Sequence, residues 1–147
     1  MVSLSNILKV NAISSGATGL LLVSVPGVAA SIFGVTTTAP FLEVGIFLLL
    51  FALFVFIVSL GKPIKTNLVK LIITLDTLWV VASAIALLFL FSVVSVWGNL
   101  IIAGVALWVA LMAFLQKRAL PSGQVSSNRL QNAAAMLTFL FVSSAVL

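Results

Sequence analysis

The sequence contains no cysteine, no histidine and no tyrosine. Without cysteine there is no disulfide, no thiolate nucleophile and no iron–sulfur ligation, and the usual zinc sites need cysteine or histidine. Haem ligation by histidine, cysteine or tyrosine is excluded as well, and so is a Ser-His-Asp triad. The familiar metal and nucleophile motifs are therefore absent.

Charged residues are scarce: they make up 6% of the 147 residues, whereas 63% are hydrophobic and the mean hydropathy is +1.41. A soluble domain carries about a quarter charged residues, which solvate its surface. The apolar residues also fall in blocks about as long as the hydrocarbon core of a bilayer is thick. These features predict an integral membrane protein, with room for one domain of four or five crossings.

The apolar blocks predict an all-α bundle of four transmembrane helices over residues 1–120. The crossings are expected at about residues 7–25, 41–60, 68–91 and 97–116, with a short interfacial helix at 26–33. Pro26 and Gly27 separate this short helix from the first crossing, because proline disrupts a helix interior but suits a helix start. The alternative is one kinked helix that continues to residue 33.

Two end segments need separate interpretation. Lys9, the following apolar run and Val28-Ala29-Ala30 resemble a secretory signal peptide with its cleavage site, but we expect this segment to be retained as the first crossing. Residues 121–128 are typical of a polar linker. Residues 129–147 are expected to form a C-terminal apolar helix, either a fifth crossing or a helix lying along the membrane or against a partner.

All seven basic residues fall on one side of the predicted bundle. They are Lys9, Lys62, Lys65, Lys70, Lys117, Arg118 and Arg129. The loops at 34–39 and 92–99 have none, and Trp97 is expected as an interfacial anchor. The positive-inside rule therefore predicts a cytoplasmic N terminus, and also a cytoplasmic C terminus unless there is a fifth crossing. The basic residues are too dispersed to bind nucleic acid.

Small residues recur at the spacing of helix-packing surfaces. On the first crossing they are Ala12 with Gly16, and Ser15 with Gly19; on the fourth they are Ala103, Ala106, Ala110 and Ala113. Small side chains let two helix backbones approach closely in lipid, where packing drives association. Both crossings are therefore expected to pack against other helices.

Asp76 lies well inside the third crossing. If Lys70 marks the cytoplasmic interface, Asp76 is about 9 Å deeper along the helix. A charge inside a membrane costs at least about 2.5–3.5 kcal/mol, so this residue should face protein or a water-filled cavity. The expected intramembrane polar cluster consists of Asp76, Asn11, Ser15 and Ser83. A structural role, in which a hydrogen-bonded carboxyl fixes helix packing, is favoured over a proton or cation step or headgroup recognition.

Glu43 is the only other acid. It is expected in the first turn of the second crossing, at the outer interface, where the helix dipole favours an anion. Glu43 and Asp76 therefore belong near opposite faces of the membrane and are poorly placed as a catalytic pair. We expect no enzymatic activity.

Three features together resemble a known family. They are the N-terminal LKVNAISSGATGLLLVSVPGVAASIFGV, the acid–Trp segment LDTLWVVAS and the charged stop after the fourth crossing. They resemble small DoxX-like four-helix proteins of the bacterial inner membrane. The resemblance covers about residues 1–120, rests on a hydropathy pattern with a Pro-Gly break, and supplies no catalytic residues. It implies a four-helix bundle in a bacterial inner membrane.

The leading functional hypothesis is a non-enzymatic accessory or assembly subunit of a larger membrane complex, with membrane lipid and other subunits as partners. Minimal loops, small-residue faces and the apolar tail favour it. One alternative is a small transporter or channel subunit that uses Asp76. Another is a protein that binds lipid, quinone or pigment, with Trp79, Trp108 and some of the 11 phenylalanines lining the site. No cofactor is predicted, and these aromatics are more often ordinary core or lipid-facing residues.

Overall fold

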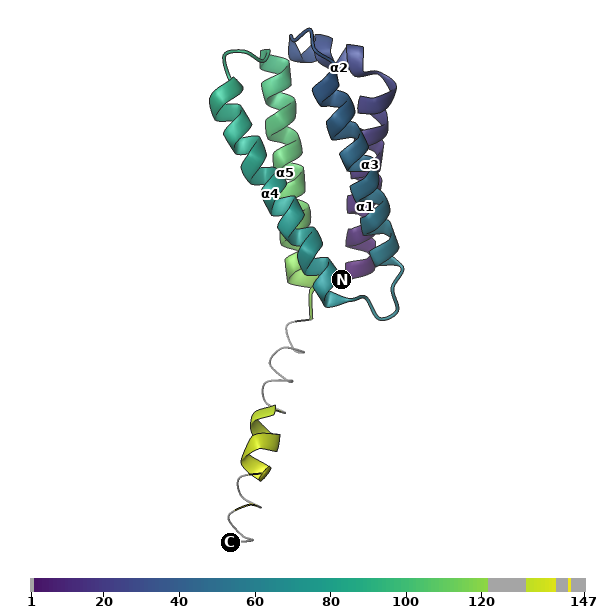
Figure 1. Cartoon of the computed structure of the whole chain (residues 1–147), viewed down its shortest axis with the longest axis vertical. Coiled ribbons are helices and arrows are strands. Elements are labelled where there is room, and N and C mark those ends of the chain that lie inside the picture. Colours follow the sequence, from purple (N-terminus) through teal and green to yellow (C-terminus); the bar gives the residue numbers. More distant parts are fainter. Residues whose placement is uncertain (1, 122–131, 140–142, 144–147) are drawn as a thin grey trace.

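The computed structural model describes residues 2–121, 132–139 and 143. The regular elements among them are all helical: α1 (Leu4–Ser24), α2 (Pro26–Phe33), α3 (Ala39–Ser59), α4 (Thr66–Leu90), α5 (Val96–Ala119) and a helical stretch at 132–139. The helices α1, α3, α4 and α5 are each long and apolar enough to cross a membrane. This confirms the predicted all-α membrane bundle with four crossings (Figure 1).

The first crossing and the short helix after it are separate elements. Val25 leaves the helical conformation, with φ −135° and ψ 56°, and Pro26 begins α2. Gly34 ends α2 in the left-handed conformation at φ 71°, which favours glycine. The alternative of one kinked helix to residue 33 is therefore wrong.

Two helix ends differ from the prediction in ways that matter for charged residues. The helix α3 begins at Ala39, so Glu43 lies beyond the first turn and is exposed there. Its expected place in the first turn is therefore wrong. The helix α5 continues to Ala119, so Lys117 and Arg118 belong to its last turn rather than following it. Basic residues are favourable at that end of the helix dipole.

Most of the C-terminal segment lies outside the described residues. Of the predicted linker at 121–128 only residue 121 is described, and of the apolar helix at 129–147 only 132–139 and 143. Residues 132–139 are helical and their side chains are exposed. The possible fifth crossing stays a prediction.

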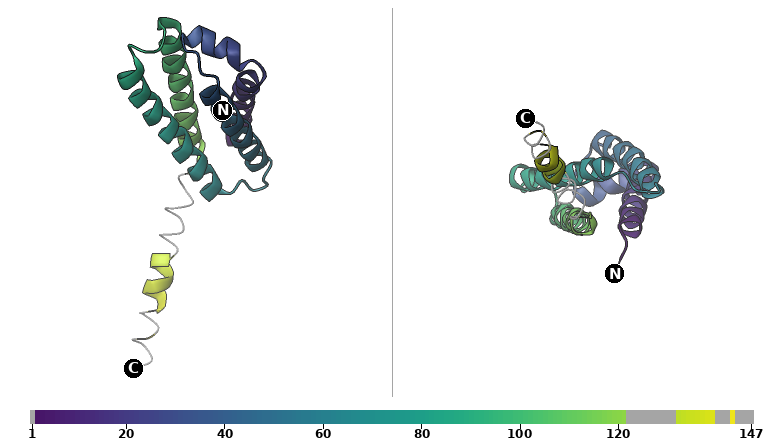
Figure 2. Two further views of the ribbon diagram at one scale, coloured as in Figure 1. Left: turned by 45° about the horizontal axis from the view of Figure 1, so that its top comes forward. Right: turned by 90° about the horizontal axis from the view of Figure 1, so that it is seen from below.

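The four crossings form two hairpin-like pairs. One pair is α1 with α3 and the other is α4 with α5, whereas α3 and α4 are consecutive in the chain but make few contacts (Figures 1 and 2). At the end of the bundle opposite the N terminus, Ser95 joins the start of α5 to the end of α2. Its backbone N–H donates to Phe33 O at 2.9 Å and its hydroxyl donates to Ile32 O. At this end the two pairs are therefore linked through α2 and α5.

Small residues bring α1 and α3 together. A Cβ atom added at Gly19 would lie 2.8 Å from Gly45 O, and one added at Gly16 would lie 3.4 Å from the Cβ of Ala52. Ala12 of the same helix is buried in the core. The face predicted on the first crossing therefore lies at a helix contact. The four alanines of α5 (Ala103, Ala106, Ala110 and Ala113) are half-buried.

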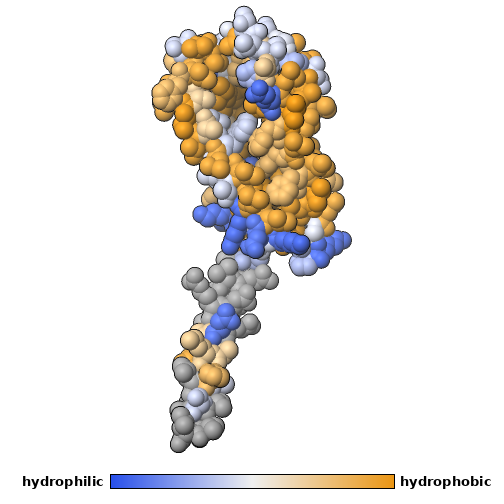
Figure 3. All heavy atoms as spheres, in the orientation of Figure 1, coloured by the Kyte–Doolittle hydropathy of each residue, from blue (hydrophilic) through white to orange (hydrophobic). Residues whose placement is uncertain are grey.

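The basic residues gather at one end of the bundle. The helix α1 starts there, α3 and α4 are connected there and α5 ends there, and these are the places where the six described lysines and arginines lie (Figures 1 and 3). Trp97 lies in the first turn of α5, at the other end, and is 71% exposed. We call the first end the basic end.

Candidate functional site

Asp76 of α4 is the centre of a buried hydrogen-bond network between three helices. Its Oδ2 atom accepts from Asn11 Nδ2 of α1 at 2.8 Å and from Gln116 Nε2 of α5 at 3.1 Å. The exposed fractions are 3% for Asp76, 1% for Asn11 and 0% for Gln116. The carboxyl group therefore connects the two helix pairs in the interior of the bundle.

The structure brings together three of the four residues expected in the polar cluster. Ser15 Oγ donates to Asn11 Oδ1 at 3.3 Å, one turn along α1, so Ser15 supports the amide that donates to Asp76. Ser83 is not part of the cluster, and its expected place there is wrong. Its hydroxyl donates to Trp79 O of its own helix at 2.8 Å. Seven residues correspond to about 10 Å of helix, too far for a serine side chain to reach Asp76.

Gln116 is the partner that sequence reasoning missed. It was expected at the end of the fourth crossing, next to Lys117 and Arg118, where an amide is ordinarily solvated. Because α5 continues to Ala119, the side chain of Gln116 turns into the bundle instead. Its Oε1 atom is enclosed and has no hydrogen-bond partner among the described residues. The sequence feature that could have indicated Gln116 is its position next to basic residues, because Asn11 likewise follows shortly after Lys9.

The two amide partners of Asp76 lie closer to the basic end than Asp76 itself, which is six residues from Lys70 along α4. Asn11 is two residues from Lys9, about 3 Å along the helix, and Gln116 is adjacent to Lys117. The amide partners of Asp76 are thus within one helical turn of charged residues.

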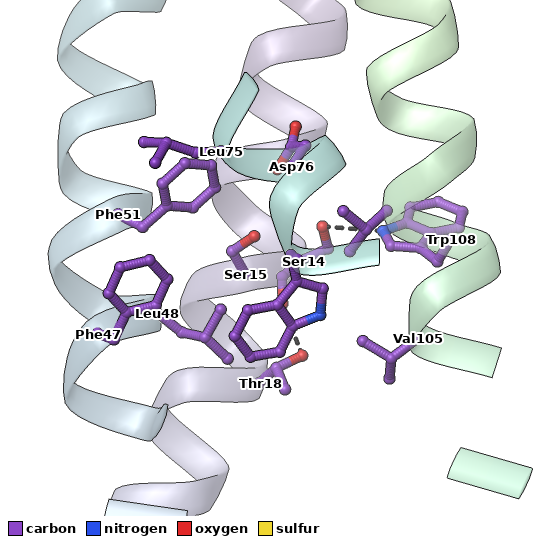
Figure 4. Close-up of a pocket in the computed structure, with 12 residues that line it drawn as sticks. Ser14, Ser15, Thr18, Phe47, Leu48, Phe51, Leu75, Asp76, Val105 and Trp108 are labelled. Atoms are coloured by element: carbon purple, nitrogen blue, oxygen red, sulfur yellow. Dashed lines mark hydrogen bonds between the residues drawn. The ribbon is translucent and has the colours of Figure 1, made fainter. Parts of the chain in front are cut away.

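A cavity of about 40 Å³ adjoins Asp76 inside the bundle (Figure 4). Its polar lining residues are Asp76, Ser14, Ser15 and Thr18, and its other lining residues are Phe47, Leu48, Phe51, Leu75, Trp79, Val105, Trp108 and Val109. Four helices contribute to the wall. Three hydroxyl groups of α1 therefore share one cavity with the buried carboxyl of α4.

Aromatic rings position parts of this wall. The rings of Phe47 and Trp79 stack at 6.2 Å between centroids, with only 2° between their planes. Trp108 Nε1 donates to Ser14 Oγ at 3.1 Å (Figure 4). These contacts join α3 to α4 and α5 to α1, so the cavity lies where the two helix pairs meet.

A second, larger crevice of about 680 Å³ lies between α4 and α5, towards the end opposite the basic end. It is lined by apolar residues and by Asn99. The Asn99 amide donates to Phe91 O at 3.1 Å and to Val94 O at 3.0 Å, so it closes the turn between the helices. An apolar crevice of this kind is ordinary lipid-facing surface and contains no group for chemistry.

The described residues contain no group of three or more histidine, cysteine, aspartate or glutamate side chains that could hold a metal ion. Glu43 lies near the start of α3 and Asp76 near the middle of α4, so the structure does not bring the two acids together. The site can bind and orient a polar group, but it offers no second acid or base for proton transfer.

No protein-family model, no curated protein and no solved structure matches this chain. The DoxX-like resemblance therefore stays an expectation from hydropathy, and it contributes nothing to the site. The functional argument rests on the carboxyl group, the amides around it and the cavity beside it.

Proposed function

We propose that this chain is a non-enzymatic, multi-pass protein of the bacterial inner membrane that binds a small ligand, or the polar end of a larger one, beside Asp76. The observation that supports this proposal is the cavity at the meeting point of the two helix pairs, which a buried carboxyl and three hydroxyl groups line. Each polar group costs free energy to bury in a membrane bundle, so a carboxyl and three hydroxyl groups that share one cavity favour a polar occupant there over simple apolar packing.

Access from the membrane side is consistent with this function. The surface is hollowed between the two helix pairs, and the residues inside the hollow are less hydrophobic than its rim (Figure 3). The helices α3 and α4 make few contacts along this opening. A ligand dissolved in the bilayer can therefore approach the polar residues between α3 and α4, beside the stacked rings of Phe47 and Trp79.

The proposal is tested by filling the cavity. Thr18→Leu places an apolar side chain in the cavity, and Thr74→Leu is the matched control. Thr18 lines the cavity, whereas Thr74 is exposed on α4, and each hydroxyl donates to a carbonyl of its own helix at 2.9 Å. We expect native mass spectrometry to find a molecule on the wild-type protein and on the control, and a much smaller amount on Thr18→Leu. Equal occupancy in all three proteins would contradict the proposal.

The proposed orientation puts the basic end in the cytoplasm, because positive residues are retained on that side. The absence of cysteine allows single-cysteine labelling without background. Cysteine at Lys65, at the basic end, is expected to react with a membrane-impermeant maleimide only after cells are permeabilised. Cysteine at Thr37, in the α2–α3 connection, is expected to react in intact cells. The reverse labelling pattern would show that the basic end faces outward and that the proposed orientation is wrong.

A second candidate function is an accessory or assembly subunit of a larger complex. Its support is the exposure of α4, of whose membrane-spanning part only 11% is buried, against 28–33% for the other three crossings. A partner helix would cover this face. Purification in mild detergent is expected to retain larger partners, and elution as a lone monomer would argue against this function.

A further inference from the structure

We propose that the group bound beside Asp76 is a primary ammonium group, which is a monovalent cation with three N–H donors. This inference rests on the proposed binding function and names the chemistry of its ligand. The charge, hydrogen-bonding capacity, walls and size of the cavity support it.

The only charge that the lining of the cavity can carry is negative. Asp76 is the only ionisable residue that lines the cavity. Its side chain accepts hydrogen bonds from two neutral amides and from no basic residue among those the structure describes. An anionic ligand would therefore meet a carboxylate without any compensating cation, whereas a cation supplies the missing opposite charge.

The hydroxyl hydrogens of the cavity are already used within α1. Ser14 Oγ donates to Asn11 O at 3.0 Å, Ser15 Oγ to Asn11 Oδ1 at 3.3 Å and Thr18 Oγ1 to Ser14 O at 2.9 Å. A hydroxyl oxygen has two acceptor lone pairs besides its one donor. The three hydroxyl groups consequently present acceptors to a ligand.

The remaining polar groups lead to the same conclusion. Both amide donors meet Asp76 at Oδ2, so Oδ1 is left without a hydrogen bond among the described residues, and it is not fully enclosed. The N–H of Trp108 is used by Ser14, and that of Trp79 is the one lining indole donor for which the described residues give no partner. The cavity thus has several acceptors and at most one free indole donor. A ligand rich in N–H donors matches this wall.

The aromatic wall and the size of the cavity select among cations. Faces of tryptophan and phenylalanine attract a nearby cation, by about 0.5–2 kcal/mol each. A volume of about 40 Å³ holds roughly three water-sized groups, at about 10–15 Å³ for each. That admits an ammonium nitrogen with its first carbons. A quaternary ammonium has no N–H to donate, and Ca²⁺ or Mg²⁺ needs about six oxygens and more negative charge than one carboxylate supplies.

An ammonium group can reach this site from two sources. One is a free small amine, and the other is the ethanolamine headgroup of an inner-leaflet phospholipid. The amide partners of Asp76 lie within one turn of the basic end, and the cavity continues from there into the bundle to Thr18, nine residues or about 14 Å along α1 from Lys9. The hollow between the helix pairs gives a path to it from the outer surface (Figure 3). Both sources present the same cation, so the experiment has an arm for each.

The experiment uses the full chain purified in detergent, with thermal unfolding as the readout. Ethylammonium chloride is expected to raise the midpoint of unfolding with saturation, whereas tetramethylammonium, sodium and potassium chloride at equal ionic strength are not. In the lipid arm, phosphatidylethanolamine is expected to stabilise the protein more than phosphatidylcholine does. A response in the first arm alone identifies a free amine, and a response in the lipid arm alone identifies the headgroup; either result supports the proposal.

Asp76→Asn is the decisive variant, because its amide oxygen still accepts from Asn11 and Gln116 while the charge is gone. We expect it to fold and to bind the amine at least about tenfold more weakly, since a buried charge pair is lost. Glu43→Gln, which removes the exposed acid, is the control and should respond like the wild type. Equal stabilisation by tetramethylammonium or potassium, no response in either arm, or an unchanged response of Asp76→Asn would overturn the ammonium assignment. If native mass spectrometry meanwhile finds a ligand without an amine that Thr18→Leu removes, the binding function stands and only this inference fails.

Discussion

Gly19→Ala is expected to destabilise the bundle by about 1–3 kcal/mol, the usual cost of overpacking a close contact. The added Cβ atom would lie 2.8 Å from Gly45 O and 3.0 Å from the Cβ of Leu48. Both atoms are part of the α3 backbone or attached directly to it, so α1 and α3 must move apart. Because this pair holds one wall of the cavity, ligand binding should weaken together with stability. Reversible unfolding in mixed detergent micelles measures the effect.

Gly104→Ala is the matched control for this substitution. Gly104 is also helical, in α5, but a Cβ atom there meets nothing within 4 Å. Alanine at an open helical position costs no packing, and it favours the helix by up to about 1 kcal/mol. The control should therefore be at least as stable as the wild type. If both substitutions had the same effect, the α1–α3 contact would not depend on glycine.

Asp76→Ala is expected to cost several kcal/mol of stability. It leaves the amide donors of Asn11 and Gln116 buried without their acceptor, at about 1–3 kcal/mol for each. The lost Asn11 bond joins α1 to α4 across the two helix pairs, whereas the Gln116 bond lies within the α4–α5 pair. The two helix pairs should therefore separate before either one unfolds. Hydrogen exchange should accordingly show α1–α3 and α4–α5 losing protection as two units.

Two variants separate this effect from a general sensitivity of α4. Thr77→Ala changes the next residue, which is exposed and donates only to Ile73 O of its own helix at 2.7 Å, and it should be near neutral. Replacing Asp76, Asn11 and Gln116 together by leucine removes donors and acceptor at once, which is often neutral or stabilising. The triple variant should therefore recover much of the stability and still fail to bind an amine. An Asp76→Ala protein as stable as Thr77→Ala would show that the network does not hold the pairs together.

The sequence by itself determined the membrane class, the number of crossings among the described residues and the gathering of basic residues at one end. These properties depend on hydropathy and charge summed over whole segments, so they do not require knowledge of which helix touches which. It also indicated Asp76 and Asn11, because an acid inside a crossing has to find a polar partner. The small-residue face of the first crossing was predictable for a similar reason, since its spacing is a local property of one helix.

Only the tertiary structure decided which residues meet. Gln116 reaches Asp76 because α5 continues past it and turns its side chain inward, whereas its neighbours in the sequence pointed to an interfacial residue. Ser83 stays on its own helix, and Gly45 was not recognisable as the partner of Gly19. The cavity beside Asp76 depends on the rotation of four helices and on the opening between two pairs. The two hydrogen bonds to Asp76, for example, join residues 65 and 40 positions apart, and no periodicity within a single segment records such relations.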